Sequence, residues 1–361
     1  MPQYAKGVTC YFCHNVDTVG AEHDNANLTL AMDDVMRGGI SNPVDSPAHD
    51  TTHAGLQDSL DPTSATMCGT CHDVYTPAPP APMPVHLERT FAEWQTTIFG
   101  QDNPRTHLTC GQCHMFATDG VVTSGPGAAN LDVPLRPLGV HEHTFGGIDQ
   151  ALTPWPEKDG QIAAITRDLG PAIGAKLCVS PTNGGEIQVT LDDRGPGHNW
   201  PSGAAQDRRA WVQLIAYDAS NNVVFQSGVV PAGKDPEEIG DPNLWQMNDV
   251  VTDATGAPAH FFWQVANYDG KATLPPAVTT DISDPRYYHA VTHSYPVPGM
   301  IGQFARVDVR VSIRPLPLAM LDDLVAGGDL DPVTVSGLQT IDLVGTELEW
   351  TAAMGTQTCA M

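Results

Sequence analysis

The chain has 361 residues, and its 42 acidic residues against 17 lysines and arginines give a formal net charge of −25 at pH 7. A negative charge of this size argues against partners that are themselves polyanions, namely nucleic acid and anionic lipid surfaces. The length is enough for two domains, or for one apolar core together with a region that a cofactor organises.

A five-residue pattern, Cys-x-x-Cys-His, occurs three times in the first third of the chain. It is the attachment pattern of c-type haem: two cysteines three positions apart can each bond one edge of a porphyrin, and the histidine that follows ligates the iron. A zinc site would need a tetrahedral set of ligands and gives no reason for a histidine after every cysteine pair. The sequence therefore predicts three covalently attached haems c, bound through Cys10, Cys13, Cys68, Cys71, Cys110 and Cys113, with His14, His72 and His114 as axial ligands.

The rest of the first 150 residues has few apolar stretches with a clear period. Residues 77–84 are rich in proline and are expected to be extended. One helix is predicted after them, because Leu87, Phe91, Trp94 and Ile98 recur at spacings that place them on one face. Such a region is expected to pack around its haems, since its own side chains supply little core.

From about residue 180 the pattern changes to strands. Apolar residues alternate with polar ones over 187–191 and 307–313, and residues 211–217 and 223–225 flank a turn at 218–222. Residues 260–265 form a further apolar run, expected to be a strand, and 318–326 read as a short helix that ends at two glycines. The predicted fold class is α+β: a tri-haem region of loops and short helices over 1–175, then an antiparallel β-sandwich over 176–361 that serves assembly or docking.

Two cysteines, Cys178 and Cys359, lie outside the haem motifs. In an oxidising compartment two such thiols most simply pair, which would tie the end of the chain to its middle. Two unpaired buried thiols, or a bond between two chains, are the alternatives.

The chain resembles multihaem c-type cytochromes in which a haem-bearing N-terminal region precedes a β-sandwich, and among them extracellular electron-transfer cytochromes that stack into conducting filaments. The stretches that carry the resemblance are residues 7–14, 67–74, 87–94, 108–115, 143–147, 197–203, 208–211 and 314–318. The resemblance implies three distal histidines on the far side of the irons. They are His49 before the second motif, His143 in a His-x-Phe-x-Gly segment, and His198 in a Gly-His-x-x-Pro-x-Gly loop.

Other histidines remain as alternative distal ligands. His53 lies four residues after His49, His86 precedes the predicted helix, and His107 lies three residues before Cys110, within reach of a neighbouring haem. His23 and His141 are weaker candidates, and His260, His289 and His293 fall in the strand region, where a structural role is expected.

The function depends on the sixth ligand of each iron, because an iron closed on both faces exchanges electrons whereas an open one can bind and transform a small molecule. We expect an electron-transfer protein with three bis-histidine haems, not an enzyme, which exchanges electrons with redox protein partners or extracellular acceptors. The alternatives are a periplasmic multihaem reductase with one open haem, and a structural or adhesive surface protein.

Covalent haem attachment takes place outside the cytoplasm, so we expect an exported chain that is the mature part of a longer precursor. No apolar stretch reaches the ~18–20 residues that a membrane-spanning helix needs. The expected location is the cell exterior or surface, with the periplasm as the alternative. The predicted sandwich has no haem motif and is large for a protein that only carries electrons between partners. We therefore predict that it serves assembly, into a homo-oligomer or an end-to-end homopolymer.

Overall fold

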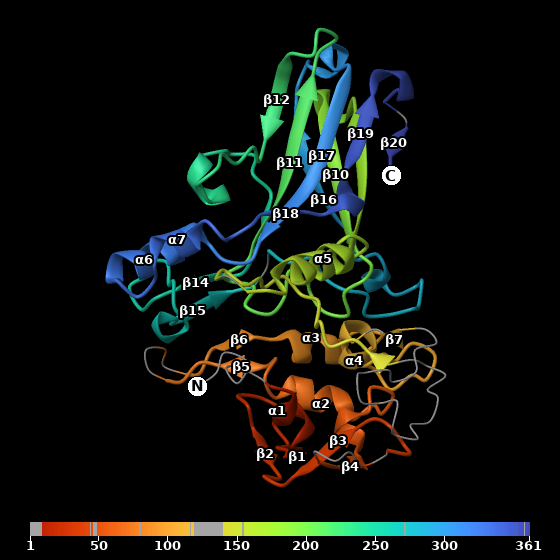
Figure 1. Cartoon of the computed structure of the whole chain (residues 1–361). Helices are drawn as coiled ribbons and strands as arrows, with labels where there is room; N and C mark the ends of the chain where they lie inside the picture. The colour runs from red at the N-terminus through yellow and green to blue at the C-terminus, as the bar shows by residue number, and fades with distance from the viewer. Residues whose placement is uncertain are drawn as a thin grey trace. The chain divides into compact units, whose positions relative to one another are not determined.

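A computed structural model describes residues 9–43, 45, 49–78, 81, 83–115, 117–118, 140–153, 155–270, 272–356 and 358–361 (Figure 1). Residues 7–8 of the first motif segment, residues 46–48 just before His49, and residues 79–80 and 82 of the proline-rich segment lie outside the described residues. The chain divides into two compact units. The motif unit comprises Met1–Tyr75 and His86–Gly146, and the sheet unit comprises Thr76–Val85 and Gly147–Met361. The boundary expected at residue 175 lies inside the sheet unit.

The motif unit is built of short helices and two-stranded ribbons. Among its described residues, the buried apolar side chains are Val16, Ala65, Leu87 and Phe91. So small a core is what the expected packing around haem requires. The helices are α1 (Cys10–His14), η2 (Gly55–Gln57), α2 (Ser64–Gly69), α3 (Thr90–Thr96) and α4 (Cys110–His114). The ribbons pair β1 (Val16–Val19) with β2 (Leu28–Leu30), β3 (Val35–Gly38) with β4 (Asp50–His53), β5 (Val74–Tyr75) with β6 (His86–Glu88), and β7 (Ala117–Thr118) with β8 (Val140–His141).

The helix predicted over 87–98 is shorter in the structure. Leu87 lies in strand β6, and α3 ends at Thr96, before Ile98. The hydroxyls of Thr96 and Thr97 donate to the carbonyls of Glu93 and Trp94, at 2.7 and 2.8 Å. Such local bonds offer the backbone an alternative to continuing the helix.

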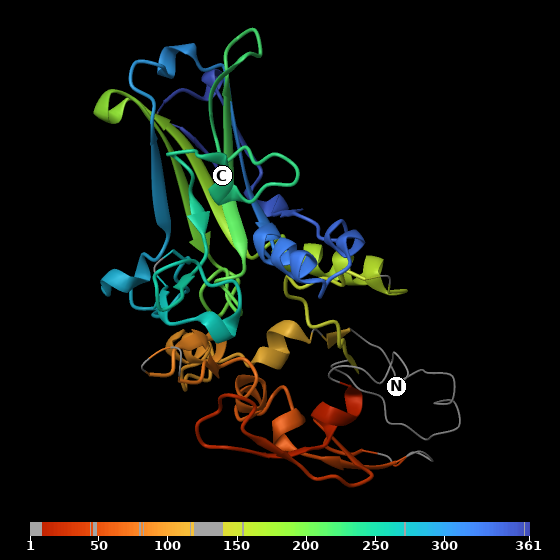
Figure 2. The ribbon, with the colours of Figure 1, turned by 90° about the vertical axis from the view of Figure 1, so that its left-hand side faces the viewer.

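The sheet unit holds two larger antiparallel sheets (Figure 2). Their buried side chains form one cluster. Burial alternates along the central strands, as in β17, where Val307, Val309 and Val311 point into the core. The α+β class is confirmed. One sheet has the order β16 (Val291–Pro296), β10 (Glu186–Asp193), β9 (Ile173–Ser180), β20 (Cys359–Ala360). The other has the order β12 (Val223–Ser227), β11 (Arg209–Tyr217), β17 (Arg306–Arg314), β18 (Ile341–Asp342), with β13 (Gln246–Met247) on β11 and β19 (Leu348–Thr351) on β17.

The remaining elements of this unit surround the sheets. The helices are α5 (Lys158–Leu169), α6 (Leu318–Gly327) and α7 (Pro332–Val335), and β14 (Val250–Thr252) pairs with β15 (Asn267–Asp269). The 3-10 turns are η4 (Thr182–Gly184), η5 (Pro236–Ile239), η6 (Phe262–Gln264), η7 (Pro285–Tyr287), η8 (Ile301–Gln303), η9 (Val344–Thr346) and η10 (Ala352–Met354). No helix among the described residues has the length and apolarity to cross a membrane.

Most sequence-predicted elements of this unit are confirmed: β10, β11, β12, β17 and α6 all lie where the pattern placed them. The strand predicted over 260–265 is wrong, because the segment contains the 3-10 turn η6. The side chain of Gln264 accepts hydrogen bonds from the backbone N–H groups of His260 and Phe261, at 3.0 and 3.1 Å, and so closes a turn. A short apolar run without alternation does not distinguish a strand from a turn, so the sequence could not predict this one.

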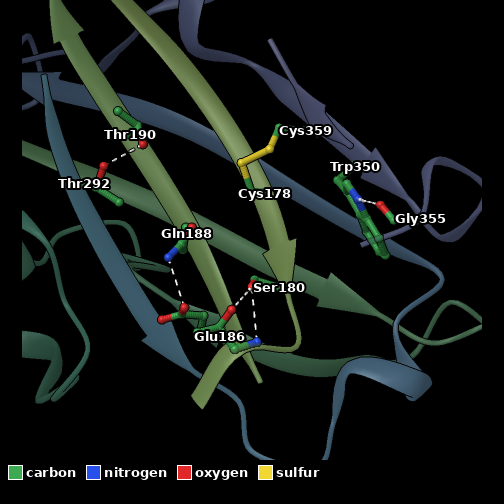
Figure 3. Close-up of a disulfide and its surroundings, with 10 residues drawn as sticks. Cys178, Ser180, Glu186, Gln188, Thr190, Thr292, Trp350, Gly355 and Cys359 are labelled. Atoms are coloured by element: carbon green, nitrogen blue, oxygen red, sulfur yellow. Dashed lines mark hydrogen bonds between the residues drawn. A yellow bond between two sulfur atoms is a disulfide. The ribbon is translucent and has the colours of Figure 1, made fainter. Parts of the chain in front are cut away.

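Cys178 and Cys359 form a disulfide, which resolves the alternatives left open by the sequence (Figure 3). The two cysteines are direct partners in the register of β9 and β20, with their Cα atoms 4.4 Å apart. The bond joins residues 181 positions apart and fastens the last strand to the sheet.

Candidate haem-binding site

Each Cys-x-x-Cys-His motif is carried by a short helix or its end. The first and third motifs are helices α1 and α4, whereas α2 ends at Gly69 and leaves Cys71 and His72 in the turn that follows. In the third motif the local sequence sets the helix start, because the hydroxyl of Thr109 accepts from the N–H of Gln112 and the side chain of Gln112 accepts from the N–H of Thr109. A helical turn places the two cysteines of a motif on one side of the backbone, as attachment to one porphyrin edge requires.

The six motif cysteines form no disulfide, and thiols of different motifs lie near one another. Burial raises the pKa of the Cys13 thiol, and the nearby thiols of Cys68 and Cys71 raise it further. The neighbouring thiols of Cys68 and Cys110 interact, and this interaction lowers the pKa of Cys68 and raises that of Cys110. Groups attached at the three motifs would therefore lie close together.

All three motif histidines are held by a hydrogen bond from Nδ1. His14 donates to the carbonyl of Arg37 at 2.5 Å and His114 to the carbonyl of Gly146 at 2.7 Å. His72 bonds Oε1 of Glu88 at 2.9 Å. A histidine that ligates a metal through Nε2 almost always donates Nδ1–H to such a partner, which fixes the tautomer and the ring orientation.

Of the predicted distal ligands, His143 lies beside a motif histidine. Its ring centroid is 6.1 Å from that of His14, with the ring planes tilted by 32°. Two imidazoles on opposite faces of one metal ion, each with its nitrogen about 2.0 Å from the metal, have centroids about 6 Å apart. Nδ1 of His143 donates to the carbonyl of His141 at 3.0 Å, and desolvation lowers the pKa of His143. Desolvation favours the neutral form of the ring, which is the form that binds a metal, whereas the hydrogen bond to His141 acts in the opposite direction.

The other two predicted distal histidines show the same hydrogen bond. Nδ1 of His49 bonds the carbonyl of Asp50 at 3.1 Å, and Nδ1 of His198 bonds the carbonyl of Asn199 at 2.9 Å. His49 lies in the motif unit, directly before β4, and His198 lies in the sheet unit, in the loop after β10. That loop is held where the backbone of Trp200 pairs with Leu274.

Most rival histidines already use Nε2 for a hydrogen bond. Nε2 of His53 bonds Asp58 at 3.1 Å, Nε2 of His86 bonds Asp73, and Nε2 of His141 bonds the hydroxyl of Ser59 at 3.1 Å. His86 is also stacked on Tyr75, with centroids 4.0 Å apart. These contacts favour structural roles for the three side chains.

Two histidines of the motif unit carry a buried nitrogen without a hydrogen-bond partner: Nε2 of His107 and Nδ1 of His23. Both rings pack edge-on against aromatic residues of α3, His107 against Trp94 and His23 against Phe91. A buried polar atom without a partner costs free energy, which a metal ion or a hydrogen-bonding group at that atom would remove. With the small apolar core, these atoms fit a unit built around bound cofactors. From sequence, His107 was an alternative distal ligand and His23 a weaker candidate.

No group of three or more His, Cys, Asp or Glu side chains within the described ranges is arranged to hold a bare metal ion. The tetrahedral donor set that a zinc site requires is thus not seen among those residues.

No family model matches the chain, and neither does any curated protein. Among solved structures, a penta-haem cytochrome c552 from Thermochromatium tepidum matches 96% of this chain and 77% of its own, with a TM-score of 0.62 and 18% sequence identity. The two chains share a fold. That protein is a penta-haem cytochrome, whereas the sequence of this chain has three attachment motifs.

Proposed function

We propose that the chain is a multihaem c-type cytochrome that carries three haems and transfers electrons. The observation that supports this most directly is the pair formed by His14 and His143, whose rings lie at the spacing of two axial ligands. The shared hydrogen-bond pattern at Nδ1 of the motif histidines and the fold shared with a penta-haem cytochrome add to it.

The motif cysteines and the histidines described above can be assigned to three haems. The cysteine pairs would hold one haem each, and His14, His72 and His114 would each supply one ligand. His143 would close the first haem, and His49 and His198 are the proposed distal ligands of the other two, with His107 as the remaining candidate. Haem supplies one-electron exchange when bound; the protein sets its ligands, its separation from the next haem and its exposure to water.

Closed irons favour electron transfer over catalysis. An imidazole on each face leaves no coordination position for a substrate, and two neutral imidazoles stabilise ferric iron more than a histidine–methionine pair does, so low reduction potentials follow. The alternative is a reductase with one open haem.

Haem content and iron spin state test the proposal. An alkaline pyridine assay on the protein matured in a host that attaches haem c is expected to give three haems per chain. The oxidised protein is expected to show only low-spin signals in low-temperature EPR. Haem absent from the purified chain would contradict the proposal, and a high-spin signal from one third of the iron would favour the reductase.

We also propose an exported protein that works at the cell exterior or surface and assembles with copies of itself into a filament. Covalent haem attachment and the disulfide both belong to compartments outside the cytoplasm. The sheet unit carries no haem motif and is large enough to serve as the assembly module. Electron microscopy of the native protein at high concentration is expected to show polymers, and monomers alone would count against this part.

The carboxylate of Glu88 is expected to lower the reduction potential of the second haem, because a charged acceptor at Nδ1 makes His72 a more basic ligand. In a Glu88→Gln variant we expect one potential of the three to rise by about 60 mV, equivalent to a tenfold change in relative affinity for the two oxidation states. Spectroelectrochemical titration measures this. Glu93→Gln is the control, since Glu93 pairs with Arg89; equal shifts in both variants would contradict the assignment.

A further inference from the structure

The side chain of Gln57 connects the first two motifs. Its Nε2 donates to the carbonyls of Cys13 and Val16, both at 3.0 Å, and lies 3.7 Å from the sulfur of Met67. Cys13 belongs to the first motif and Met67 directly precedes the second. One amide group, partly buried, thus contacts the end of α1, the start of β1 and helix α2.

Ser59, two residues further on, connects this segment to the third motif. Its carbonyl accepts from the hydroxyl of Thr109 at 2.6 Å, and its own hydroxyl bonds Nε2 of His141 at 3.1 Å. Gly111 lies against it so closely that a Cβ at that position would be 2.9 Å from Cβ of Ser59. Ser59 and Thr109 are both buried, at 8% and 1% exposure.

From these contacts we propose that Gln57 and Ser59 are positioning residues that set the separation of the three haem-attachment sites and hence the coupling between neighbouring haems. The inference rests on the proposed function. Gln57 fixes the first motif relative to the second, and Ser59 with Gly111 fixes the second relative to the third. We call residues 57–59 the brace.

The brace has a specific physical role because electron exchange between haems depends steeply on their separation. Its bonds span 44 residues between Gln57 and Cys13 and 50 between Ser59 and Thr109, whereas the apolar core of the unit is small. They add to the backbone bonds that join the first two motifs elsewhere, such as the one from the N–H of Ala26 to the carbonyl of Thr70. His141 is two residues before His143, so Ser59 also contacts the strand that leads to the proposed distal ligand of the first haem.

Two variants test the brace in the full-length protein carrying its haems. Gln57→Met keeps the length of the side chain and removes both N–H donors, and Gly111→Ala places a methyl group against Ser59. The matched controls are Gln101→Met, where an exposed glutamine bonds the carbonyl of Thr96, and Gly38→Ala, where an added Cβ meets nothing within 4 Å. The readouts are haem content per chain and the couplet in the Soret circular dichroism, which arises from interaction between haems.

We expect both brace variants to retain three low-spin haems but to lose roughly half of the couplet amplitude, because small displacements of a preorganised site have large effects. Both controls are expected to match the unmodified protein. In a chain limited to the first two haems by Cys110→Ala and Cys113→Ala, Gln57→Met is expected to reduce the couplet while Gly111→Ala leaves it unchanged.

An unaltered couplet in both variants overturns the inference while leaving the three-haem proposal standing. Fewer haems in Gln57→Met than in Gln101→Met also overturns it, since the residue would then act on haem attachment and not on spacing. An unmodified chain without haem contradicts the proposed function itself.

Discussion

Replacing His143 with alanine is expected to open the first haem to solvent while the other two stay closed. The ring of His143 lies 6.1 Å from that of His14, and its Nδ1 is held by the carbonyl of His141. Removal of the ring leaves a coordination position that water or an added ligand can take. One third of the ferric iron is then expected to change from low spin to high spin, and the protein should bind about one cyanide per chain.

Low-temperature EPR and a cyanide titration measure this change. His260→Ala is the control, because His260 lies in the sheet unit, where its ring bonds Asp323 at 2.5 Å. The control is expected to keep three low-spin haems and to bind no cyanide. If His143→Ala also kept all three low-spin signals, another side chain would be the sixth ligand, and His107 would be the first to test.

Removal of the disulfide is expected to have the largest effect on stability. The bond between Cys178 and Cys359 closes a loop of 181 residues, and the chain-entropy model gives about 5 kcal/mol for a loop of this size. The variant Cys178→Ala with Cys359→Ala should unfold at a lower denaturant concentration by up to that amount in free energy. The last strand, β20, should separate from β9 first, because it is two residues long and few other contacts hold it.

Denaturant unfolding followed by far-ultraviolet circular dichroism measures the loss. A thiol reductant provides the control, since it should destabilise the unmodified protein and leave the double variant unchanged; thioether bonds to haem do not respond to it. Equal midpoints for the two proteins would show that the bond contributes no net stability.

The sequence predicted well where one pattern dictates one structure. Alternation in 307–313 identified β17, and two glycines after residue 326 marked the end of α6. The prediction failed where hydrogen bonds from side chains determine the backbone conformation. Gln264 in the turn η6 and the two threonines at the end of α3 are the examples.

Some residues of the candidate site could be predicted from the sequence and others could not. The motifs are local in sequence, so the cysteines and the histidines that follow them could be read directly. The choice of His143 as a distal ligand was implied only by resemblance to known cytochromes, and its place beside His14 was not predicted. The contacts of Gln57 and Ser59 could not be predicted, because a glutamine or serine carries no signal for a bond to a residue more than 40 positions away.

Few apolar side chains are buried among the described residues of the motif unit, and this has a consequence for biogenesis. A polypeptide that buries little apolar surface does not offset the loss of conformational entropy on folding. Binding of a prosthetic group then contributes the remaining free energy of folding. Haem attachment as proposed above would therefore act on a chain that is still open, with accessible cysteines. When iron or porphyrin is scarce, we expect proteolysis to remove the unmatured polypeptide, so that its abundance follows cofactor supply.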